Sequence, residues 1–460
     1  MPGTIADPQN SLRLPPGPKG RPFLGSVIEL RRDLLGFMTG AAREYGDVVF
    51  FRLLHLPVCM LAHPDDIESV LVKNSARFIK SRDYRALAGV LGEGLLTTEN
   101  EIWRRQRRLA QPGFYRENIL NYAKTMVDRT ADAIAAWRDG TVLDVHDEMS
   151  RLTLQIVARC LFGADVSAQA REVGEALRVV AENFADYARL AMLLPKWFRI
   201  PGVSKMGRAV RRLDRILYAI IRERRAAGLS GSSNGSGDLL SLLLRARDES
   251  GRELDDLELR DETMTLFMAG HETTALALAW TWYLLGQNPD VDERLDAELR
   301  TVLGGREPSA ADLPSLPYLD RVLKESLRLF PPAWAMGREA LDDFEAGGYR
   351  VRAGTSIFIS QWVTHRDARF FPQPERFDPD RWQDDPIRRG TVPRFAYFPF
   401  GGGPRVCIGA GFAQMEAALL LATIAQRFRM TVVPDHPIKL LPSITLRPKY
   451  GIRVTIHRRA

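Results

Sequence analysis

The chain has 460 residues, a formal net charge of +7, 45% hydrophobic residues and 26% charged residues. This balance is typical of a globular protein and excludes a disordered or fibrous chain. The positive charge would suit an acidic partner, but the arginines are dispersed and we find no nucleic-acid-binding motif.

The cysteines Cys59, Cys160 and Cys407 are odd in number and far apart in the sequence. This spacing predicts no disulfide framework and favours a reducing compartment. We expect Cys59, in a strand, and Cys160, on an apolar helical stripe, to fill the core. Residues 1–25 are rich in proline and contain no apolar run long enough for a signal peptide or a membrane span. We therefore expect a cytoplasmic protein without a transmembrane anchor.

Alternating apolar residues predict a strand pair at 48–54 and 57–62, followed by a helix from Pro64 to residue 72. Helical periodicity then dominates, at 118–137, 144–161, 206–225, 239–247, 291–302 and 317–329. Strands return within 348–359 and 438–456. Residues 228–237, rich in Gly, Ser and Asn, form a flexible connector between two helices. The pattern predicts a mostly α fold with small β-sheets, in one domain over residues 1–460.

The longest predicted helix covers residues 255–285, and residues 269–274 (AGHETT) interrupt its apolar run. A glycine, a carboxylate and two hydroxyls weaken a helix and cost free energy when buried without partners. A functional site would explain this cost, and so would a helix kink with threonine bonded back to the backbone. His271-Glu272 does not complete a zinc motif because residue 275 is alanine. We expect His271 at the surface or behind the reacting groups.

Residues 400–409 (FGGGPRVCIG) place Cys407 between a glycine-rich loop and an apolar helix. Backbone N–H groups at a helix N-terminus favour a thiolate. A haem needs a thiolate ligand when electron density must be pushed through iron to cleave an O–O bond. A buried structural cysteine is the alternative, but it does not explain Phe400, Gly403 and Arg405. The sequence disfavours a dinucleotide-binding loop, because residue 414 is glutamine and a loop rather than a strand precedes the glycines.

Residues 400–409 match Phe-x-x-Gly-x-Arg-x-Cys-x-Gly, so the chain resembles the cytochrome P-450 family of haem-thiolate monooxygenases. Residues 269–274 are similar to that family's Ala/Gly-Gly-x-Asp/Glu-Thr-Thr/Ser motif. The resemblance covers nearly the whole chain. It implies a triangular, mostly helical fold with haem b between a long central helix and the cysteine loop. It also implies insertion of one oxygen atom from O2 into a hydrophobic substrate, such as a fatty acid, terpenoid or steroid.

The resemblance implies roles for single residues. Cys407 would ligate the haem iron, and Phe400, Gly403 and Gly409 would shape its loop. Ala269 and Gly270 would leave room for O2. The Thr273 hydroxyl would form a hydrogen bond with it, and Glu272 would pass protons inward from solvent. The propionate ligands would be Trp103 and Arg107, one helical turn apart, together with Arg338 and Arg405. Glu325 and Arg328 would form a buried structural cluster with Arg376.

The substrate pocket is the least specific part of the resemblance, because leucine and aromatic residues usually fill cores. An apolar flap, spaced by glycines, would provide Leu87, Val90, Leu91, Leu95 and Leu96. The family's other pocket segments correspond to Phe267, Ala333, Trp334, Met336, Ser443 and Ile444.

The family resemblance also implies a bacterial monomer that takes electrons from a ferredoxin, a flavodoxin or a separate flavin reductase. Arg104, Arg105 and Arg108 either form a solvated face or dock an acidic donor. A peroxide-driven peroxygenase or peroxidase is one alternative, although peroxide-specialised relatives commonly replace the acid and threonine. A non-catalytic haem sensor of gas or ligand is another, but it has little use for a proton relay.

Overall fold

The structure is a computed structural model that describes residues 13–164, 172–180, 183, 205–229 and 238–459. The chain forms two compact units. The first comprises Met1–Tyr84, Ala333–Arg376 and Asp384–Cys407, and the second Arg85–Pro332, Phe377–Gln383 and Ile408–Ala460. Among the described residues, no helix is both long and apolar enough to cross a membrane. The expected single domain over residues 1–460 stays a prediction, and residues 230–237 of the expected connector lie outside the described residues.

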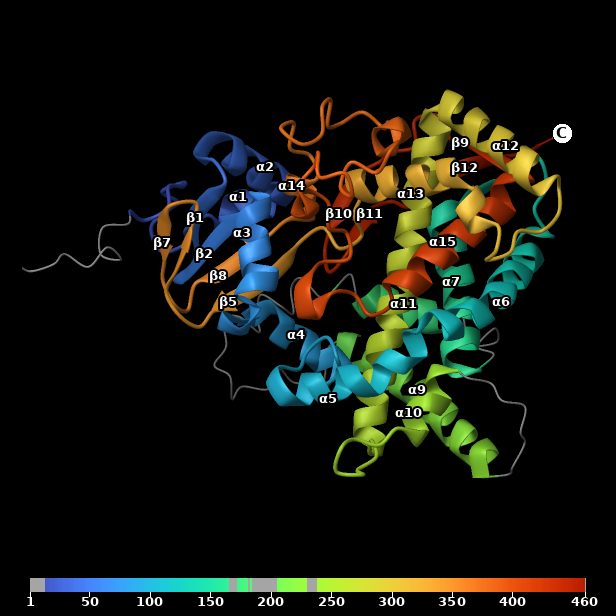
Figure 1. Ribbon diagram of the computed structural model, residues 1–460, viewed down its shortest axis with the longest axis horizontal. Coiled ribbons are helices and arrows are strands. Elements are labelled where there is room, and N and C mark those ends of the chain that lie inside the picture. Colours follow the sequence, from blue (N-terminus) through green and yellow to red (C-terminus); the bar gives the residue numbers. More distant parts are fainter. Residues whose placement is uncertain (1–12, 165–171, 181–182, 184–204, 230–237, 460) are drawn as a thin grey trace, which may run out of the picture. The chain divides into compact units, whose positions relative to one another are not determined.

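The first unit is built on a five-stranded sheet in the order β1-β2-β8-β5-β3 (Figure 1). Its strands are β1 (Val48–Leu53), β2 (Leu56–Leu61), β8 (Ser356–Ile359), β5 (Met336–Ala340) and β3 (Phe78–Lys80). β2 and β8 pair in parallel, and the other pairs are antiparallel. The predicted strand pair is confirmed to within one residue at each end.

Side chains of β2 alternate between two hydrophobic clusters, as the period of a strand requires. Val58 and Met60 pack in one cluster with Met38, whereas Cys59 and Leu61 pack in the other with Ile67. Cys59 therefore fills the core as predicted. The remaining elements of this unit are α1 (Val27–Arg32), α2 (Leu34–Tyr45), α3 (Pro64–Glu68), β6 (Phe344–Ala346), β7 (Tyr349–Val351) and α14 (Gln361–Thr364). A π-helix at Ser69–Lys73 continues α3, and short 3-10 turns lie at Ser75–Arg77, Arg394–Ala396 and Gly403–Arg405.

The second unit is mostly helical. Its helices are the greater part of α4 (Arg82–Leu91), α5 (Asn100–Ala110), α6 (Arg116–Ile134), α7 (Val145–Phe162), α9 (Lys205–Leu229), α10 (Leu239–Arg245), α11 (Asp256–Gln287), α12 (Pro289–Leu303), α13 (Pro317–Leu329) and α15 (Ala410–Ala425). Short 3-10 turns cover Gln111–Phe114, Leu313–Ser315 and Pro379–Trp382. Two small sheets complete it, β4 (Val142–Asp144) with β12 (Arg453–Arg458) and β9 (Phe428–Val432), and β10 (Leu440–Pro442) with β11 (Leu446–Pro448). The predicted helices are confirmed to within a few residues.

Helix α11 forms the centre of this unit and packs along α7 (Figure 1). Asp255 and Glu258 close a capping box at its start, which satisfies N–H groups that a helix end leaves open. Both faces are apolar along most of its length, so the helix is buried by its neighbours. Farther along, the Trp280 indole N–H donates to the Leu446 carbonyl at 2.9 Å, which ties α11 to β11.

Candidate active site

Cys407 lies at the end of a tightly constrained loop that leads into α15. Its N–H donates to the Phe400 carbonyl at 3.0 Å, and α15 begins at Ala410. Gly403 has φ +66°, and a Cβ there would lie 1.8 Å from the Leu71 carbonyl oxygen. Only glycine fits this position, since a side chain would both strain the backbone and collide with it. The loop therefore holds the cysteine in a fixed backbone frame.

Cys407 is the one exposed thiol among the three cysteines of the chain. Burial raises the pKa of the Cys59 thiol to about 12 and also raises that of Cys160. Neither buried thiol can readily provide a thiolate, whereas Cys407 is accessible and lies just before a helix N-terminus. The donor chemistry of this loop fits a haem iron.

In the AGHETT segment, part of the otherwise buried helix α11 is exposed. Ala269 is exposed and Thr273 is half-buried, whereas the residues on both sides of the segment are mostly buried. The Thr273 hydroxyl donates to the Ala269 carbonyl at 2.7 Å and keeps its capacity to accept a hydrogen bond. Back-bonding was one alternative from the sequence, and it coexists here with an uncovered surface that could receive a ligand.

Gly270 lies where helices α7 and α11 approach each other closely. A Cβ at this position would lie 3.2 Å from a methyl group of Val157 on α7. The absence of a side chain thus permits the close packing of α7 on α11. Nearby, the Thr153 hydroxyl donates to the His271 carbonyl at 2.9 Å, which ties the same two helices. The expectation that Gly270 also leaves room for O2 stays a prediction.

Glu272 is buried in an ion pair that the sequence did not indicate. Its Oε1 atom accepts a hydrogen bond from the Thr445 hydroxyl at 2.9 Å and another from Nε of Arg447 on β11. Burial raises the pKa of Glu272, but the charge of Arg447 and these bonds outweigh burial, so the pKa lies below its usual value. Glu272 is therefore a bonded carboxylate. Its role in proton transfer stays a prediction.

His271 is buried, so the expectation of a surface position is wrong, and its expected position behind the reacting groups stays a prediction. Burial lowers its pKa to about 4, and its ring lies 6.4 Å from that of Phe267. Burial likewise lowers the pKa of His146, on α7, to about 4. Both histidines are neutral near pH 7, since their charged forms are poorly solvated there.

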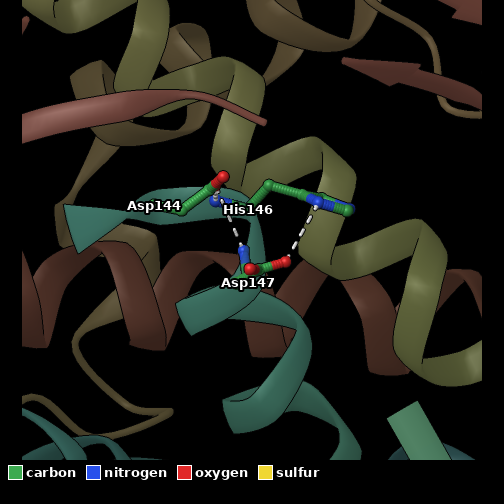
Figure 2. Close-up of side chains that lie close together, drawn as sticks. All are labelled: Asp144, His146 and Asp147. Carbon is green, nitrogen blue, oxygen red and sulfur yellow. Dashed lines mark hydrogen bonds and ion pairs between the residues drawn. The ribbon is translucent and has the colours of Figure 1, made fainter. Parts of the chain in front are cut away.

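Asp144, His146 and Asp147 lie close together at the start of α7 (Figure 2). The Asp144 carboxylate caps the helix, accepting hydrogen bonds from the backbone N–H of His146 at 2.9 Å and of Ile452 at 3.1 Å. Nδ1 of His146 lies 3.9 Å from the exposed Asp147 carboxylate. Capping and pairing account for this cluster, so we assign it no metal.

Glu416 is a buried carboxylic acid on α15 that sequence reasoning missed. Neither of its oxygens makes a hydrogen bond of good geometry with the described residues. Burial raises its pKa to about 8, although the Thr274 hydroxyl opposes this rise. Glu416 is therefore largely protonated at pH 7. The signal was a single glutamate in the otherwise apolar run after Gly409, but its environment was not readable.

Glu325 and Arg328 form the predicted buried pair, with two bonds of 2.8 Å between them and neither side chain exposed. Arg381 Nε also donates to Glu325, at 2.8 Å, and the Trp382 indole N–H donates at 2.9 Å. Such complete bonding is what a buried charge cluster requires. Arg381 and Trp382 were missed because they carry no motif, and the place of Arg376 in the cluster stays a prediction.

The four expected propionate ligands lie on three elements. Trp103 and Arg107 are half-buried one turn apart on α5, and Nε of Arg107 donates to the Gln111 side chain at 3.0 Å. Arg338 lies on β5, where it donates to the Gly337 carbonyl at 2.8 Å, and Arg405 lies in the turn before Cys407. The roles of these four residues as propionate ligands stay predictions.

Arg105 cannot be a free cation for docking an electron donor. Its guanidinium bonds Asp248 at 2.6 Å and Glu258 at 2.8 Å, and its side chain is only 16% exposed. Arg104 pairs with Glu101, and Arg108 pairs with Glu249. The expectation for Arg105 is therefore wrong, because its charge is neutralised within the chain.

The segment expected to be a mobile flap is hydrogen-bonded to α11. The N–H of Glu93 donates to Asp261 at 2.7 Å, and that of Leu95 donates to Glu262 at 3.3 Å. Leu87, Val90, Leu91 and Leu95 are buried, whereas Leu96 is half-buried. The two carboxylates that hold this loop were not recognised in the sequence.

The other expected pocket residues differ in exposure. Phe267 packs against Phe162 with ring centres 5.9 Å apart, and Trp334 packs against Phe358 at the same distance. Met336 contacts the core cluster of Cys59, while Ala333 is exposed. Ser443 and Ile444 lie half-buried in the turn between β10 and β11. Their contact with a substrate stays a prediction.

A mostly helical fold with small sheets, a long central helix that carries a threonine, and an accessible cysteine before α15 define a haem-thiolate oxygenase. The cytochrome P450 family profile matches residues 15–456. The chain therefore belongs to the cytochrome P450 family and is a haem-dependent monooxygenase of bacterial type.

The chain is 39% identical over 435 residues to cyclooctatin synthase of Streptomyces melanosporofaciens, covering 93% of this chain and 92% of that protein. It is 34% identical to pentalenene oxygenase of Streptomyces avermitilis, covering 96% and 97%. Among solved structures, a retinoic acid bound cyanobacterial CYP120A1 matches with a TM-score of 0.85 at 28% identity, covering 98% of this chain and all of that one.

Proposed function

We propose that this P450 monooxygenase oxidises a terpenoid, inserting one atom of O2 with two electrons supplied by a separate protein. The observation that carries the proposal is the 39% identity, over nearly the whole chain, to cyclooctatin synthase. Cyclooctat-9-en-7-ol 5-monooxygenase, at 38%, and pentalenene oxygenase, at 34%, support the same substrate class. A fatty acid or a steroid is less well supported, because none of these relatives is named for one.

Cys407 is the residue that would hold the haem iron, because it is the one accessible thiol and its loop tolerates no side chain at Gly403. Trp103, Arg107, Arg338 and Arg405 would hold the propionates through N–H donors. A haem with a thiolate ligand supplies the chemistry that cleaves the O–O bond. The chain's own contribution is to fix the thiolate and the acid-base groups around it.

Thr273 would support bound oxygen through its hydroxyl, which lies on the uncovered face of α11. Glu272 would connect that region to solvent, held as a carboxylate by Arg447 and Thr445. Proton transfer through such a pair is general acid catalysis at one remove. The presence of both residues favours an O2-dependent reaction over a peroxide-driven one, and it favours an enzyme over a ligand sensor.

Members of this family receive electrons from a redox partner. We infer a ferredoxin, a flavodoxin or a flavin reductase as the donor. Reconstitution with each class, NAD(P)H and O2 tests this, with hydrogen peroxide alone as the comparison. Product from a reductase system supports the proposal. Product from peroxide alone, with none from any reductase system, would establish the peroxygenase alternative.

The substrate class is tested by spectral titration of the purified ferric protein. A substrate that displaces water from the iron shifts the Soret band, so we would titrate cyclic terpene hydrocarbons and alcohols, long-chain fatty acids and steroids. We expect saturable shifts with at least one cyclic terpenoid at lower concentration than with the other classes. A tighter shift with fatty acids or steroids, and none with terpenoids, would reject the terpenoid assignment while leaving the monooxygenase class intact.

A further inference from the structure

An exposed apolar and basic patch lies at the N-terminal side of the first unit. We define the N-terminal patch as Phe23, Leu24 and Ile28 with Lys19, Arg31, Arg32 and Arg52. Phe23 is 95% exposed, and Leu24 and Ile28 are each 39% exposed. Single exposed apolar residues are ordinary on a protein surface. Three of them within six residues, one an almost bare phenylalanine, form a patch that needs an explanation.

Phe23 occupies the tip of a tight and well-anchored turn. Arg21 and Gly25 exchange two backbone hydrogen bonds of 2.8 Å, and Phe23 between them has φ +61°. A left-handed backbone is unfavourable for an aromatic residue, and so is full exposure of its ring to water. The strained conformation presents the ring outward instead of burying it. Strain of this kind at an exposed position points to an interaction.

The turn is fixed to the sheet of the first unit. The N–H of Ser26 donates to the Arg52 carbonyl at 2.8 Å, and that of Leu54 donates to the Leu24 carbonyl at 3.1 Å. The tip is therefore held by the fold and is pre-organised for contact. Because the turn is already ordered, binding would cost little further conformational entropy of its backbone.

Cations lie on the segments that adjoin this turn: Lys19 precedes it, α1 follows it, and the Arg52 carbonyl is bonded to Ser26. Lys19, Arg31, Arg32 and Arg52 are exposed. Arg21 is offset by Glu29, at 3.2 Å. Ile28, Arg31 and Arg32 are three and four residues apart on α1, so they share one face of that helix. An exposed apolar turn on a segment with several exposed cations matches the chemistry of an anionic lipid surface.

We propose that the N-terminal patch docks the enzyme peripherally on an anionic membrane, with Phe23 and Leu24 inserted at the boundary between headgroups and acyl chains. Aromatic and aliphatic side chains gain free energy there, while arginine and lysine remain at the depth of the phosphates. This is adsorption to the surface and needs no spanning helix. It is independent of which substrate the enzyme oxidises.

A membrane fits this patch better than an acidic protein does. A stable protein interface buries about 800 Å² on each partner. One narrow turn and the six-residue helix α1 offer a small surface, which suits insertion into a fluid interface better than a stable protein contact. An acidic redox partner is nevertheless the competing occupant, and the experiment separates the two.

The test is sedimentation of the full-length, haem-loaded protein with vesicles of phosphatidylcholine alone or mixed with phosphatidylglycerol. We expect binding to the mixed vesicles that weakens as salt is raised, because surface charge is screened. Phe23→Ser with Leu24→Ser should lower the partition coefficient by about tenfold or more, since the inserted apolar area is lost. Arg31→Gln with Arg32→Gln should lower it several-fold. Leu257→Ser is the matched control, because Leu257 is 62% exposed on α11.

Circular dichroism and the ferric haem spectrum should be unchanged in every variant, which separates loss of binding from loss of fold. Absence of wild-type binding to the mixed vesicles would overturn the proposal. Equal loss in Leu257→Ser would also overturn it, because binding would then be nonspecific. If the Phe23 variant keeps full vesicle binding but is reduced more slowly by an acidic donor protein, the patch belongs to the electron donor and the membrane assignment is wrong.

Discussion

Glu272 on α11 and Arg447 on β11 form a buried ion pair, with Nε of Arg447 donating to Oε1 of Glu272. The two residues are 175 positions apart in the sequence. Thr445 adds a second hydrogen bond to the same carboxylate oxygen. The pair therefore fixes the charge state and the position of the residue that the family pattern assigns to proton transfer.

Removing Arg447 should leave a buried carboxylate without its cation. We expect Arg447→Gln to lower the free energy of unfolding by about 3 kcal/mol at pH 7. Glu272→Gln in the same chain should restore part of that loss, because no charge then remains buried. Thermal unfolding of the two single variants and the double variant measures the coupling. If the losses of unfolding free energy in the two single variants add up to the loss in the double variant, the two residues do not stabilise the fold as a pair.

The same pair has a pH signature. The folded pKa of Glu272 lies below its ordinary value of 4.5, so the carboxylate stabilises the fold above that pH. This contribution should disappear as the pH falls from 4.5 through the folded pKa. The difference in unfolding free energy between wild type and Glu272→Gln should therefore shrink in that window. A difference that grows on acidification would contradict the lowered pKa.

The Thr273 hydroxyl is predicted to support oxygen without holding the haem. Thr273→Ala should retain the haem spectrum, while the product formed per electron falls by about tenfold and peroxide rises instead. Thr281→Ala is a matched control, because Thr281 also bonds a carbonyl of α11, Ala277, at 2.7 Å but is fully buried. Product, NAD(P)H and peroxide are measured together. Wild-type coupling in Thr273→Ala would remove this residue from the mechanism.

Glu416 should make the protein less stable as pH rises. Its folded pKa is raised from 4.5 to about 8 by burial, so the folded state keeps a proton that the unfolded state releases. The stabilising effect is complete below pH 4.5 and is lost as pH rises toward 8. Glu416→Gln, which cannot ionise, should gain up to about 4 kcal/mol relative to wild type between these limits. The unfolding free energies of wild type and Glu416→Gln at pH 5 and pH 8 measure this gain. The same difference between the two proteins at both pH values would refute the raised pKa.

Two glycines of the Cys407 region should respond differently to the same substitution. Gly403→Ala should lower haem incorporation severalfold, because the new Cβ would meet the Leu71 carbonyl at 1.8 Å in a left-handed backbone. Gly409→Ala should be tolerated, since its nearest neighbour would be the Phe114 ring at an ordinary 3.6 Å. The ratio of haem absorbance to protein absorbance measures the haem content of each variant. Equal haem content in the two variants would contradict the fixed frame of the loop.

Local patterns predicted the elements whose signal is continuous in the sequence. Helix α11 and the strand pair β1–β2 follow from apolar periodicity, and the Cys407 loop follows from ten adjacent residues. The missed contacts join distant segments. Arg447 reaches Glu272, and Arg105 reaches Asp248 and Glu258, without any motif that could reveal the pairing.

The surroundings of a side chain are the second property that the sequence did not predict. The protonation of Glu416 depends on burial by several helices, and the burial of His271 depends on which face α11 presents to its neighbours. The packing of Gly270 against Val157 of another helix likewise could not be read from the sequence. A motif identifies which residues are special, whereas packing determines the physical reason.

The central claim is that Cys407 provides the thiolate that holds the haem iron, and the ferrous carbonyl spectrum tests it most directly. Wild-type protein and the control variant Cys160→Ala, which alters a buried thiol, should both show the red-shifted Soret band of a thiolate-bound iron. Cys407→Ala should lose that band. A Cys407→Ala protein that retains the red-shifted band, or a haem-loaded wild type that never shows it, would contradict the account.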